Sequence, residues 1–544
     1  MKKTSPAANL EIKKKLLLFY CCCLCMGVQA QRNYSHPSID VLHYTFSLAL
    51  NDENNMIKGE AIISVLFLQP VSGFDLDLVK KNNNGKGMTV TNVQENNVPV
   101  PFTQEEELIH IQSTARPGDT VIYTIGYEGI PADGLIIDKT KYGRRSFFGD
   151  NWPNRAHNWL PCIDNPADKA SVDFIVTAPE HYQIIANGLK TEENNLPHQL
   201  KQTHWKETVA LPTKIMVIGA ADFAVNYAGD VDCIPVYSWV YPEDKDKGFY
   251  DYALAKEILP FFIRQVGPYA YRKLANVQSK TKFGGMENAS AIFYSENSVQ
   301  GDRKVEALLT HEIAHQWFGD AATEISWPHV WLSEGFATYM THLYLENKYG
   351  PDTLQKRLLE DREKVIAFSK KKNAPVVDTS VISNFLQLLN ANSYQKGGWI
   401  LHMLRRKLGD GVFWQGIRNY YAQYAGKNAS TDDFRKVMEA ACGHDLQSFF
   451  RQWLFTAGQP VLNTRWEYDA KKKTLIIAVE QLQNNLFSFP LQLLVETGNG
   501  KEIKTLDIKD KITTLTVSSA TAPFKITLDP GCNLLFEERL AVTK

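Results

Sequence analysis

The pattern His-Glu-x-x-His at residues 311–315 constrains the fold of this chain more than any other sequence feature. Positions i and i+4 lie on one face of an α-helix, so a helix here would direct the rings of His311 and His315 at one point. The flanking sequence favours a helix, because residues 302–318 are rich in apolar side chains and contain no proline or glycine. The motif predicts a helix that presents two imidazoles to a metal ion; the alternative is a helix with ordinary surface histidines.

A third candidate ligand is Glu334, with eighteen residues between it and His315. A second helix packed against the first would bring this carboxylate to the same ion. Two histidines and a glutamate are a standard set for catalytic zinc, which takes three protein ligands and leaves a fourth position open for water. We therefore expect one Zn²⁺ per chain, bound by His311, His315 and Glu334. The alternative for Glu334 is a solvated carboxylate at the start of a helix.

Glu312 lies between the two histidines in the sequence and cannot easily bind the same ion from there. It can instead face a water on the metal and act as a general base. Zinc lowers the pKa of its bound water towards ~7, so a carboxylate can take that proton at neutral pH. The pattern thus predicts hydrolysis by zinc-activated water, with Glu312 as the catalytic base.

A glycine-rich segment precedes the predicted zinc helix: Phe283-Gly284-Gly285-Met286-Glu287-Asn288. Adjacent glycines let another backbone approach closely, and Glu287 offers a negative charge to a cationic group. Together with the zinc motif, the segment resembles the aminopeptidase N family of zinc metallopeptidases (gluzincins), in particular its leukotriene hydrolase-like branch. That family has Gly-x-Met-Glu-Asn shortly before His-Glu-x-x-His, and then a glutamate after eighteen residues. Without that context, the alternative is a turn with an exposed glutamate.

The resemblance implies roles for further residues. Substrate would be bound by the segment Gly284, Gly285, Met286, Glu287 and Asn288, with Glu287 holding the α-ammonium group. Tyr394 lies in Tyr394-Gln395-Lys396-Gly397, which resembles the family's Tyr-x-Lys-Gly segment, and would donate a hydrogen bond to the oxyanion of the tetrahedral intermediate. Without the resemblance, Tyr394 would be taken for a core residue.

Two positions depart from the family pattern. Ser333 stands where the family usually has asparagine. Residues 160–164 resemble a segment that closes over the active site from the N-terminal domain, where family members usually place a glutamate or glutamine near the substrate amine. Here Asp150-Asn151-Trp152 offers no clear equivalent.

Hydrophobic patterning divides the chain into three parts. Alternating segments such as 43–50 and 121–127 predict strands, helical spacing runs from about residue 245 to 455, and strands return at 475–479 and 487–491. Ser430 is expected to be a helix N-cap. We expect an α+β multidomain fold: a signal peptide at 1–30, an N-terminal antiparallel β domain at 31–225, a mainly α catalytic domain at 226–457, and a C-terminal β-sandwich domain at 458–544. By the resemblance, the catalytic domain would be thermolysin-like.

The first thirty residues have the pattern of a cleavable secretory signal. Three lysines at 13–15 precede an apolar run of 13 residues at 16–28, and Val28-Gln29-Ala30 fits a cleavage site. The run is too short to span a bilayer of ~30 Å as a helix. We therefore expect a periplasmic or secreted protein with no stable transmembrane segment after signal cleavage. The alternative is an uncleaved membrane anchor.

Charge excludes one class of partner. Fifty-nine basic and 60 acidic residues give a formal net charge of -1, so nothing favours nucleic acid. The resulting hypothesis is a zinc-dependent aminopeptidase, similar to membrane alanyl aminopeptidases, that hydrolyses the first bond of peptides with a free N-terminus. Two alternatives stay open: a thermolysin-type zinc endopeptidase, and a catalytically silent peptide-binding protein on the same scaffold.

Overall fold

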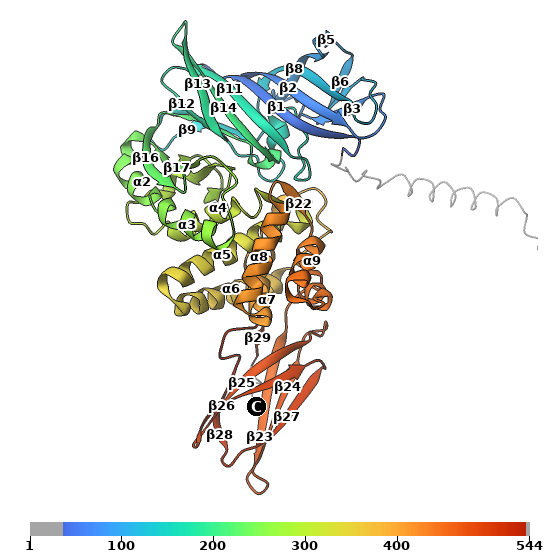
Figure 1. Cartoon of the computed structure of the whole chain (residues 1–544), viewed down its shortest axis with the longest axis vertical. Coiled ribbons are helices and arrows are strands. Elements are labelled where there is room, and N and C mark those ends of the chain that lie inside the picture. The colour runs from blue at the N-terminus through green and yellow to red at the C-terminus, as the bar shows by residue number, and fades with distance from the viewer. Residues whose placement is uncertain (1–35, 540–544) are drawn as a thin grey trace, which may run out of the picture.

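The structure is a computed structural model and describes residues 36–539. A β-rich N-terminal part, a helical middle part and a C-terminal part made of strands follow one another along the long axis of the molecule (Figure 1). The expected α+β multidomain fold class is confirmed. The segment read as a signal peptide lies outside the described residues.

An eight-stranded sheet forms the body of the N-terminal part. Neighbouring strands are antiparallel except for β1 and β11, which pair in parallel. Buried and less buried residues alternate along β2, as expected for a strand with one face on a core. In sheet order the strands are β13 (Leu189–Leu196), β14 (Leu200–Leu211), β11 (Ala170–Pro179), β1 (Ile39–Ala49), β2 (Ile57–Phe67), β8 (Thr120–Ile130), β4 (Gly87–Glu95) and β5 (Val98–Pro99).

Two smaller sheets complete this part. One has the order β12 (Gln183–Ala186), β15 (Ile218–Ala221), β10 (Arg145–Gly149) and β9 (Leu135–Lys139). The other has the order β3 (Phe74–Asp77), β7 (Leu108–Ile111) and β6 (Phe102–Glu105). The segment that follows β10, residues 150–155, reaches the middle part of the chain and becomes important below.

The middle part opens with a five-stranded sheet that the helical patterning did not predict. Its order is β16 (Ala224–Val231), β17 (Ile234–Val240), β18 (Leu274–Ser279), β20 (Ala291–Ser295) and β19 (Gly285–Met286). The inner pairs, β17 with β18 and β18 with β20, are parallel. Strand β19 lies at the edge and pairs only with β20 within this sheet.

A two-stranded parallel sheet of β21 (Ala322–Glu324) and β22 (Lys427–Ala429) follows, and helices make up most of the rest of the middle part. They are α2 (Lys245–Tyr252), α3 (Ala255–Gln265), α4 (Glu306–His315), α5 (Trp331–Tyr349), α6 (Pro351–Lys371), α7 (Gly397–Leu408), α8 (Asp410–Tyr424), α9 (Thr431–Cys442) and α10 (Gln447–Phe450). A short π-helix, η7 (Asn392–Lys396), leads into α7. Ser430 caps α9 in a capping box with Asp433, so the N-cap predicted from sequence is confirmed.

Helix α5 packs against α4 on one side and against η7 and α7 on the other. The second contact is close because two glycines meet there. A Cβ atom placed on Gly335 would lie 2.9 Å from the Cα of Gly397, well inside van der Waals contact. The two backbones therefore touch next to Glu334, which the site described below requires.

The C-terminal part consists of two sheets. One has the order β27 (Ile512–Ser518), β24 (Thr474–Gln481), β23 (Val461–Asp469) and β29 (Glu537–Glu538); the other has the order β26 (Gly500–Ile508), β25 (Phe489–Thr497) and β28 (Pro523–Leu528). The predicted domain boundary after residue 225 lies inside β16, and the one after 457 precedes β23. These boundaries stay predictions. None of the helices in residues 36–539 has both the length and the hydropathy that a membrane crossing needs.

Candidate active site

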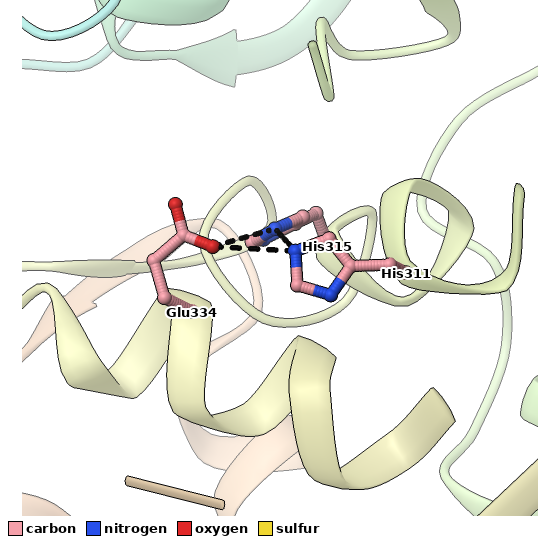
Figure 2. Close-up of side chains that lie close together, drawn as sticks. All are labelled: His311, His315 and Glu334. Atoms are coloured by element: carbon pink, nitrogen blue, oxygen red, sulfur yellow. Dashed lines mark hydrogen bonds and ion pairs between the residues drawn. The ribbon is translucent and has the colours of Figure 1, made fainter. Parts of the chain in front are cut away.

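The two histidines and Glu334 converge as the motif predicts. His311 and His315 stand one turn apart on α4, and Glu334 lies in the first turn of α5 (Figure 2). The Nε2 atoms of the two rings are 3.2 Å apart. Glu334 Oε2 lies 3.3 Å from Nε2 of His311 and 3.2 Å from Nε2 of His315.

This triangle has the dimensions of a zinc site. Ligand atoms about 2.0–2.1 Å from a tetrahedral zinc lie about 3.3 Å from one another, which matches the three distances. Glu334 Oε2 is buried, and its contacts in the triangle are with the two Nε2 atoms, which are themselves metal-ligand atoms. The donor set and its spacing therefore fit Zn²⁺.

The electrostatics of the triangle favour a positive charge. Burial lowers the pKa of His311, which favours the neutral ring that a metal needs. Burial also opposes charge on His315, but the carboxylates of Glu334 and Glu287 outweigh it and raise the pKa of His315 to about 10. In the protein without a metal, a proton on His315 balances the negative charge of these carboxylates. A bound metal cation can balance the same charge instead.

Two oxygen atoms of the protein lie close to Nδ1 of the His315 ring. Its Nδ1 lies 3.1 Å from the carbonyl oxygen of Phe318 and 3.0 Å from Oγ of Ser333. If Nδ1 carries the proton and donates it to these acceptors, Nε2 is left free to bind a cation. Ser333, the departure from the family pattern, thus contributes to fixing the ring.

Glu312 is buried beside the same cavity. Gly285 in β19 runs along its side chain so closely that a Cβ on Gly285 would lie 2.2 Å from Glu312 Oε1. Burial raises the pKa of Glu312 well above its usual value, and the charge of Glu287 adds to the rise. Ligand atoms of Glu287, Glu312 and His315 all lie within 4.8 Å of one another, so the predicted base and the predicted amine anchor face one space.

Only some residues of the segment 284–288 line this cavity. Gly285, Met286 and Glu287 line the cavity, whereas Gly284 and Asn288 flank it without lining it. Oε1 of Glu287 is buried and has no hydrogen-bond partner among the described residues. A buried carboxylate oxygen without a partner is costly, so it marks a place where a cationic donor belongs.

Tyr394 lines another side of the cavity. It sits on η7, and its ring lies 5.9 Å from that of His311 at an interplanar angle of 13°. Burial and the charge of Glu334 raise the pKa of Tyr394, so the phenol stays protonated near neutral pH and remains a hydrogen-bond donor.

Comparison with known proteins agrees with this geometry. Residues 40–215 match the Peptidase M1 N-terminal domain, and residues 250–453 match the Peptidase family M1 domain. The chain belongs to the peptidase M1 family. The resemblance to the aminopeptidase N family of zinc metallopeptidases is thereby confirmed, while its leukotriene hydrolase-like branch stays a prediction.

Similar M1 proteins include aminopeptidases. The chain is 27% identical over 465 residues to the "Probable aminopeptidase 2" of Sulfurisphaera tokodaii, covering 81% of this chain and 58% of that protein. It is 25% identical over 509 residues to "Aminopeptidase 2" of Candida albicans, covering 87% of this chain and 52% of that protein. The chain thus spans about half the length of these curated relatives.

A solved structure shares the fold. A crystal structure of a mutant of the M1 zinc metallopeptidase from Deinococcus radiodurans superposes with a TM-score of 0.65 at 23% identity. The match covers 77% of this chain and 94% of that one.

Three cavity residues of this M1 chain were not predicted from the motifs. Trp152 reaches in from the N-terminal part, and Phe283 and Leu389 come from segments on either side of the zinc helix in the sequence. They line a cavity of about 50 Å³ together with the metal triangle and Glu287. Aromatic and aliphatic residues carry no motif signal, because the same residue types also fill the core.

A fourth residue, Gln316, connects the zinc helix to the amine anchor. Its Nε2 donates to the carbonyl oxygen of Glu287 at 2.6 Å, and its Oε1 accepts from the backbone N–H of Ser290 at 2.8 Å. Gln316 directly follows His315, so one buried amide ties the loop that carries Glu287 to the helix that carries the histidines.

Proposed function

We propose that this chain is a zinc-dependent aminopeptidase that hydrolyses the N-terminal bond of peptides with a free N-terminus. The observation that carries the proposal is Glu287, whose buried Oε1 has no hydrogen-bond partner in the part of the chain that the structure describes and which lines the same cavity as His311, His315 and Glu334. The peptidase M1 domains and the relatives named aminopeptidases support it.

His311, His315 and Glu334 would hold one Zn²⁺ per chain. Zinc bound there supplies a Lewis acid that polarises the scissile carbonyl and makes water acidic enough to react at neutral pH.

Glu312 acts as the general base and then as the general acid. It is too near the histidines in sequence to share their ion easily, but it faces the space between the triangle and Glu287. It takes a proton from the attacking water and delivers it to the nitrogen of the leaving peptide. Burial favours the protonated form that this second step requires.

Tyr394 stabilises the oxyanion. Its phenol lines the cavity beside His311 and can donate a hydrogen bond to the oxygen on which negative charge develops. Loss of one such donor typically lowers the rate by ~10²–10³.

Glu287 limits cleavage to the first bond. Its carboxylate pairs with the α-ammonium group of the substrate, and its ligand atom lies within 4.8 Å of that of His315, so the charged end of the substrate is held next to the metal triangle. The free edge of β19 can pair with the extended substrate backbone, since within its sheet β19 has a neighbour on one side only. A thermolysin-type endopeptidase would have no use for this carboxylate.

Aminoacyl anilides test the proposal when compared with their N-acetylated forms. We expect turnover of the free-amine substrates alone, dependent on zinc, and a loss of at least about 10²-fold in kcat/KM for Glu287→Ala. Equal cleavage of blocked and unblocked substrates would establish the endopeptidase instead. Bound zinc without any turnover would establish the catalytically silent binding protein.

Glu287→Gln provides a matched variant, because it keeps the shape and removes only the charge. It should lose most of the preference for a free amine while it retains bound zinc. If Glu287→Gln kept the full preference for unblocked substrates, the carboxylate would not be the anchor.

We also propose that the protein is exported, either secreted or periplasmic. Support comes from the basic and apolar pattern of residues 13–30. N-terminal sequencing of the protein purified from its native cells should begin at Gln31. An intact residue 1 in a membrane fraction would instead establish the uncleaved anchor.

A further inference from the structure

Trp152 is the residue through which the N-terminal part of the molecule reaches the proposed active site. Its indole lines the cavity that also contains Glu287, Glu312 and the metal triangle. The ring makes edge-to-face contacts with two other aromatic rings, Phe283 at 6.5 Å and Trp327 at 5.3 Å between centroids. Trp152 therefore belongs to an aromatic wall built from both parts of the chain.

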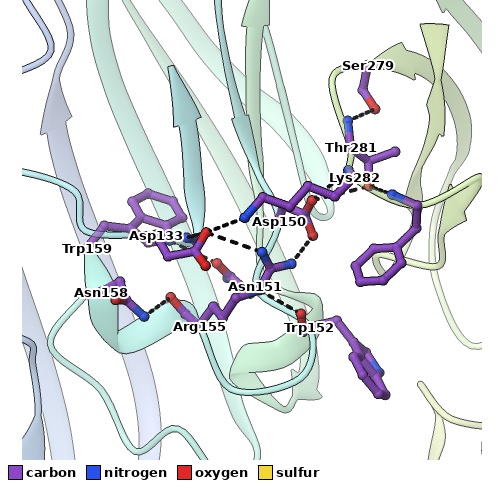
Figure 3. A network of polar contacts seen from close by, with 12 residues as sticks. Asp133, Asp150, Asn151, Trp152, Arg155, Asn158, Trp159, Ser279, Thr281 and Lys282 are labelled. Atoms are coloured by element: carbon purple, nitrogen blue, oxygen red, sulfur yellow. Dashed lines mark hydrogen bonds and ion pairs between the residues drawn. The ribbon is translucent and has the colours of Figure 1, made fainter. Parts of the chain in front are cut away.

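A partly buried polar network, with Asp150 at its buried end, fixes the turn that carries Trp152 (Figure 3). Arg155 donates to the carbonyl oxygen of Trp152 at 2.8 Å and to Asp150 at 2.5 Å. Asp150 is fully buried, and its other oxygen accepts from the backbone N–H of Lys282 at 3.0 Å and from the hydroxyl of Thr281 at 3.3 Å.

Asp133 closes the network from the other side. It accepts from Nζ of Lys282 at 2.7 Å and from Arg155 at 3.2 Å. Lys282 immediately precedes Phe283 and the glycine-rich segment, so these contacts hold Trp152 in register with the backbone that carries Glu287. A charge-assisted network of this kind is expected to be rigid.

The charged residues and the apolar residues that line the cavity have different roles. Its charged members are His311, Glu312, His315, Glu334 and Glu287, all of which serve the metal, the water or the amine. The remaining wall is Trp152, Phe283, Met286 and Leu389 together with Gly285 and the ring of Tyr394. Among residues 36–539, no arginine or lysine lines the cavity, and each lining carboxylate already has one of these roles.

One atom of Trp152 also lacks a partner. Its Nε1 is buried and makes no hydrogen bond to any described residue. A buried N–H donor of this kind usually finds an acceptor, so a bound ligand with an oxygen at this place would complete it.

We infer that Trp152 is a specificity-determining residue, which contacts the first residue of the substrate and selects uncharged, apolar side chains there. The inference rests on the proposed aminopeptidase function and deepens it by naming the substrate class. A leucine or methionine side chain would bury its apolar surface against the indole, whereas a charged one would lose its hydration without gaining a partner.

The test compares kcat/KM for leucine and glutamate anilides in the wild type, Trp152→Ala and Trp152→Phe. Wild type should prefer leucine strongly. Trp152→Ala removes the wall and admits water, so the leucine to glutamate ratio should fall at least about tenfold. Trp152→Phe keeps an apolar ring and should hold the ratio within about threefold of wild type.

Trp205→Ala is the matched control, because it removes another buried indole of the N-terminal part, on β14, that does not line the cavity. Its ratio should stay close to wild type in protein that contains zinc and unfolds cooperatively. An unchanged ratio in Trp152→Ala, an equal change in Trp205→Ala, or a lost preference in Trp152→Phe would each overturn the inference. If wild type cleaves no unblocked anilide, the proposed function itself has failed.

Discussion

His315 is held by two acceptors behind its ring, and only one of them is a side chain. Removing Ser333 Oγ leaves the carbonyl oxygen of Phe318, 3.1 Å from Nδ1, to orient the ring. We therefore predict that Ser333→Ala weakens zinc binding by about tenfold, at the lower end of the effects seen when such supporting groups are lost. Competition with a chelator measures the zinc dissociation constant. Ser448→Ala, at an exposed position, is the control. A loss of zinc affinity above about 10²-fold in Ser333→Ala would mean that the carbonyl oxygen of Phe318 alone does not orient the ring.

Gln316 positions the amine anchor from the zinc helix. Gln316→Met has nearly the same shape but leaves the carbonyl oxygen of Glu287 and the N–H of Ser290 without their partners. An unpaired buried group costs about 1–3 kcal/mol, which the loop can relieve by shifting Glu287. We predict that Gln316→Met lowers kcat/KM by about 10- to 10²-fold, chiefly through KM, while zinc content is unchanged.

The split between KM and kcat decides the role of Gln316. A residue that only stabilises the fold would lower thermal stability and leave KM unchanged for the folded protein. Steady-state kinetics with an unblocked anilide, together with zinc analysis, distinguish the two outcomes. A fall in kcat alone would mean that Gln316 does not act through Glu287.

At the scale of elements, the contact between α5 and the η7–α7 segment places Glu334 and Tyr394 on one cavity. Gly335 and Gly397 permit this contact, because neither has a side chain at the crossing point. Gly397→Ala would force the two backbones apart. We predict a loss of about 1–3 kcal/mol in the free energy of unfolding and a fall in kcat of at least about tenfold, since both residues would move relative to the histidines.

The control for this prediction is Gly411→Ala. Gly411 lies in α8, and a Cβ there would meet no atom within 4 Å. Alanine in a helix is about 0.5–1 kcal/mol more favourable than glycine, so this variant should be neutral or slightly stabilised in urea unfolding. If Gly397→Ala behaved like Gly411→Ala, the close approach of the helices would not matter to the site.

Elements with a local pattern could be predicted from the sequence, and the others could not. The spacing of His311 and His315 is a property of one helix, and Ser430 caps α9 through contacts within four residues. In contrast, β18 is buried on both faces and lies between parallel neighbours, so it shows none of the alternation that marks a half-exposed strand.

Site residues divide in the same way. Trp152 and Glu287 are 135 positions apart in the chain, and only the packing of the N-terminal part on the middle part brings them to one cavity. The sequence does not distinguish Gln316 from other polar residues at the end of a helix. Its role follows only from its partners in the loop at 287–290. Contacts of this kind depend on tertiary structure, for which a single sequence offers no spacing rule.

At the scale of the whole molecule, buried polar contacts join the three parts. Between the N-terminal and middle parts, Nζ of Lys214 donates to Glu324 at 2.6 Å, with both side chains almost completely buried. Between the middle and C-terminal parts, Nε2 of His402 on α7 donates to the carbonyl oxygen of Cys532 at 2.9 Å. Each contact is a fixed pairing that a shift of one part relative to the next would break.

The contact at His402 makes the stability of the molecule depend on pH. Burial lowers the pKa of His402 to about 3, and the charges of Arg405 and Arg406 add to the effect, whereas the unfolded value is near 6.5. Between the two pKa values, His402 binds a proton in the unfolded chain but not in the folded one, so acid favours unfolding. Between pH 7 and pH 5 this histidine should lower the free energy of unfolding by about 2 kcal/mol.

His402→Gln tests this effect, since its amide can still donate to the carbonyl oxygen of Cys532 but takes up no proton. We expect the decline in stability from pH 7 to pH 5, measured by urea unfolding of the zinc-loaded protein, to be about 2 kcal/mol smaller in His402→Gln than in wild type. The exposed His444→Gln should decline as wild type does. Because loss of zinc in acid affects all three proteins alike, the difference between them isolates His402, and parallel declines would mean that its imidazole is not held neutral at the joint.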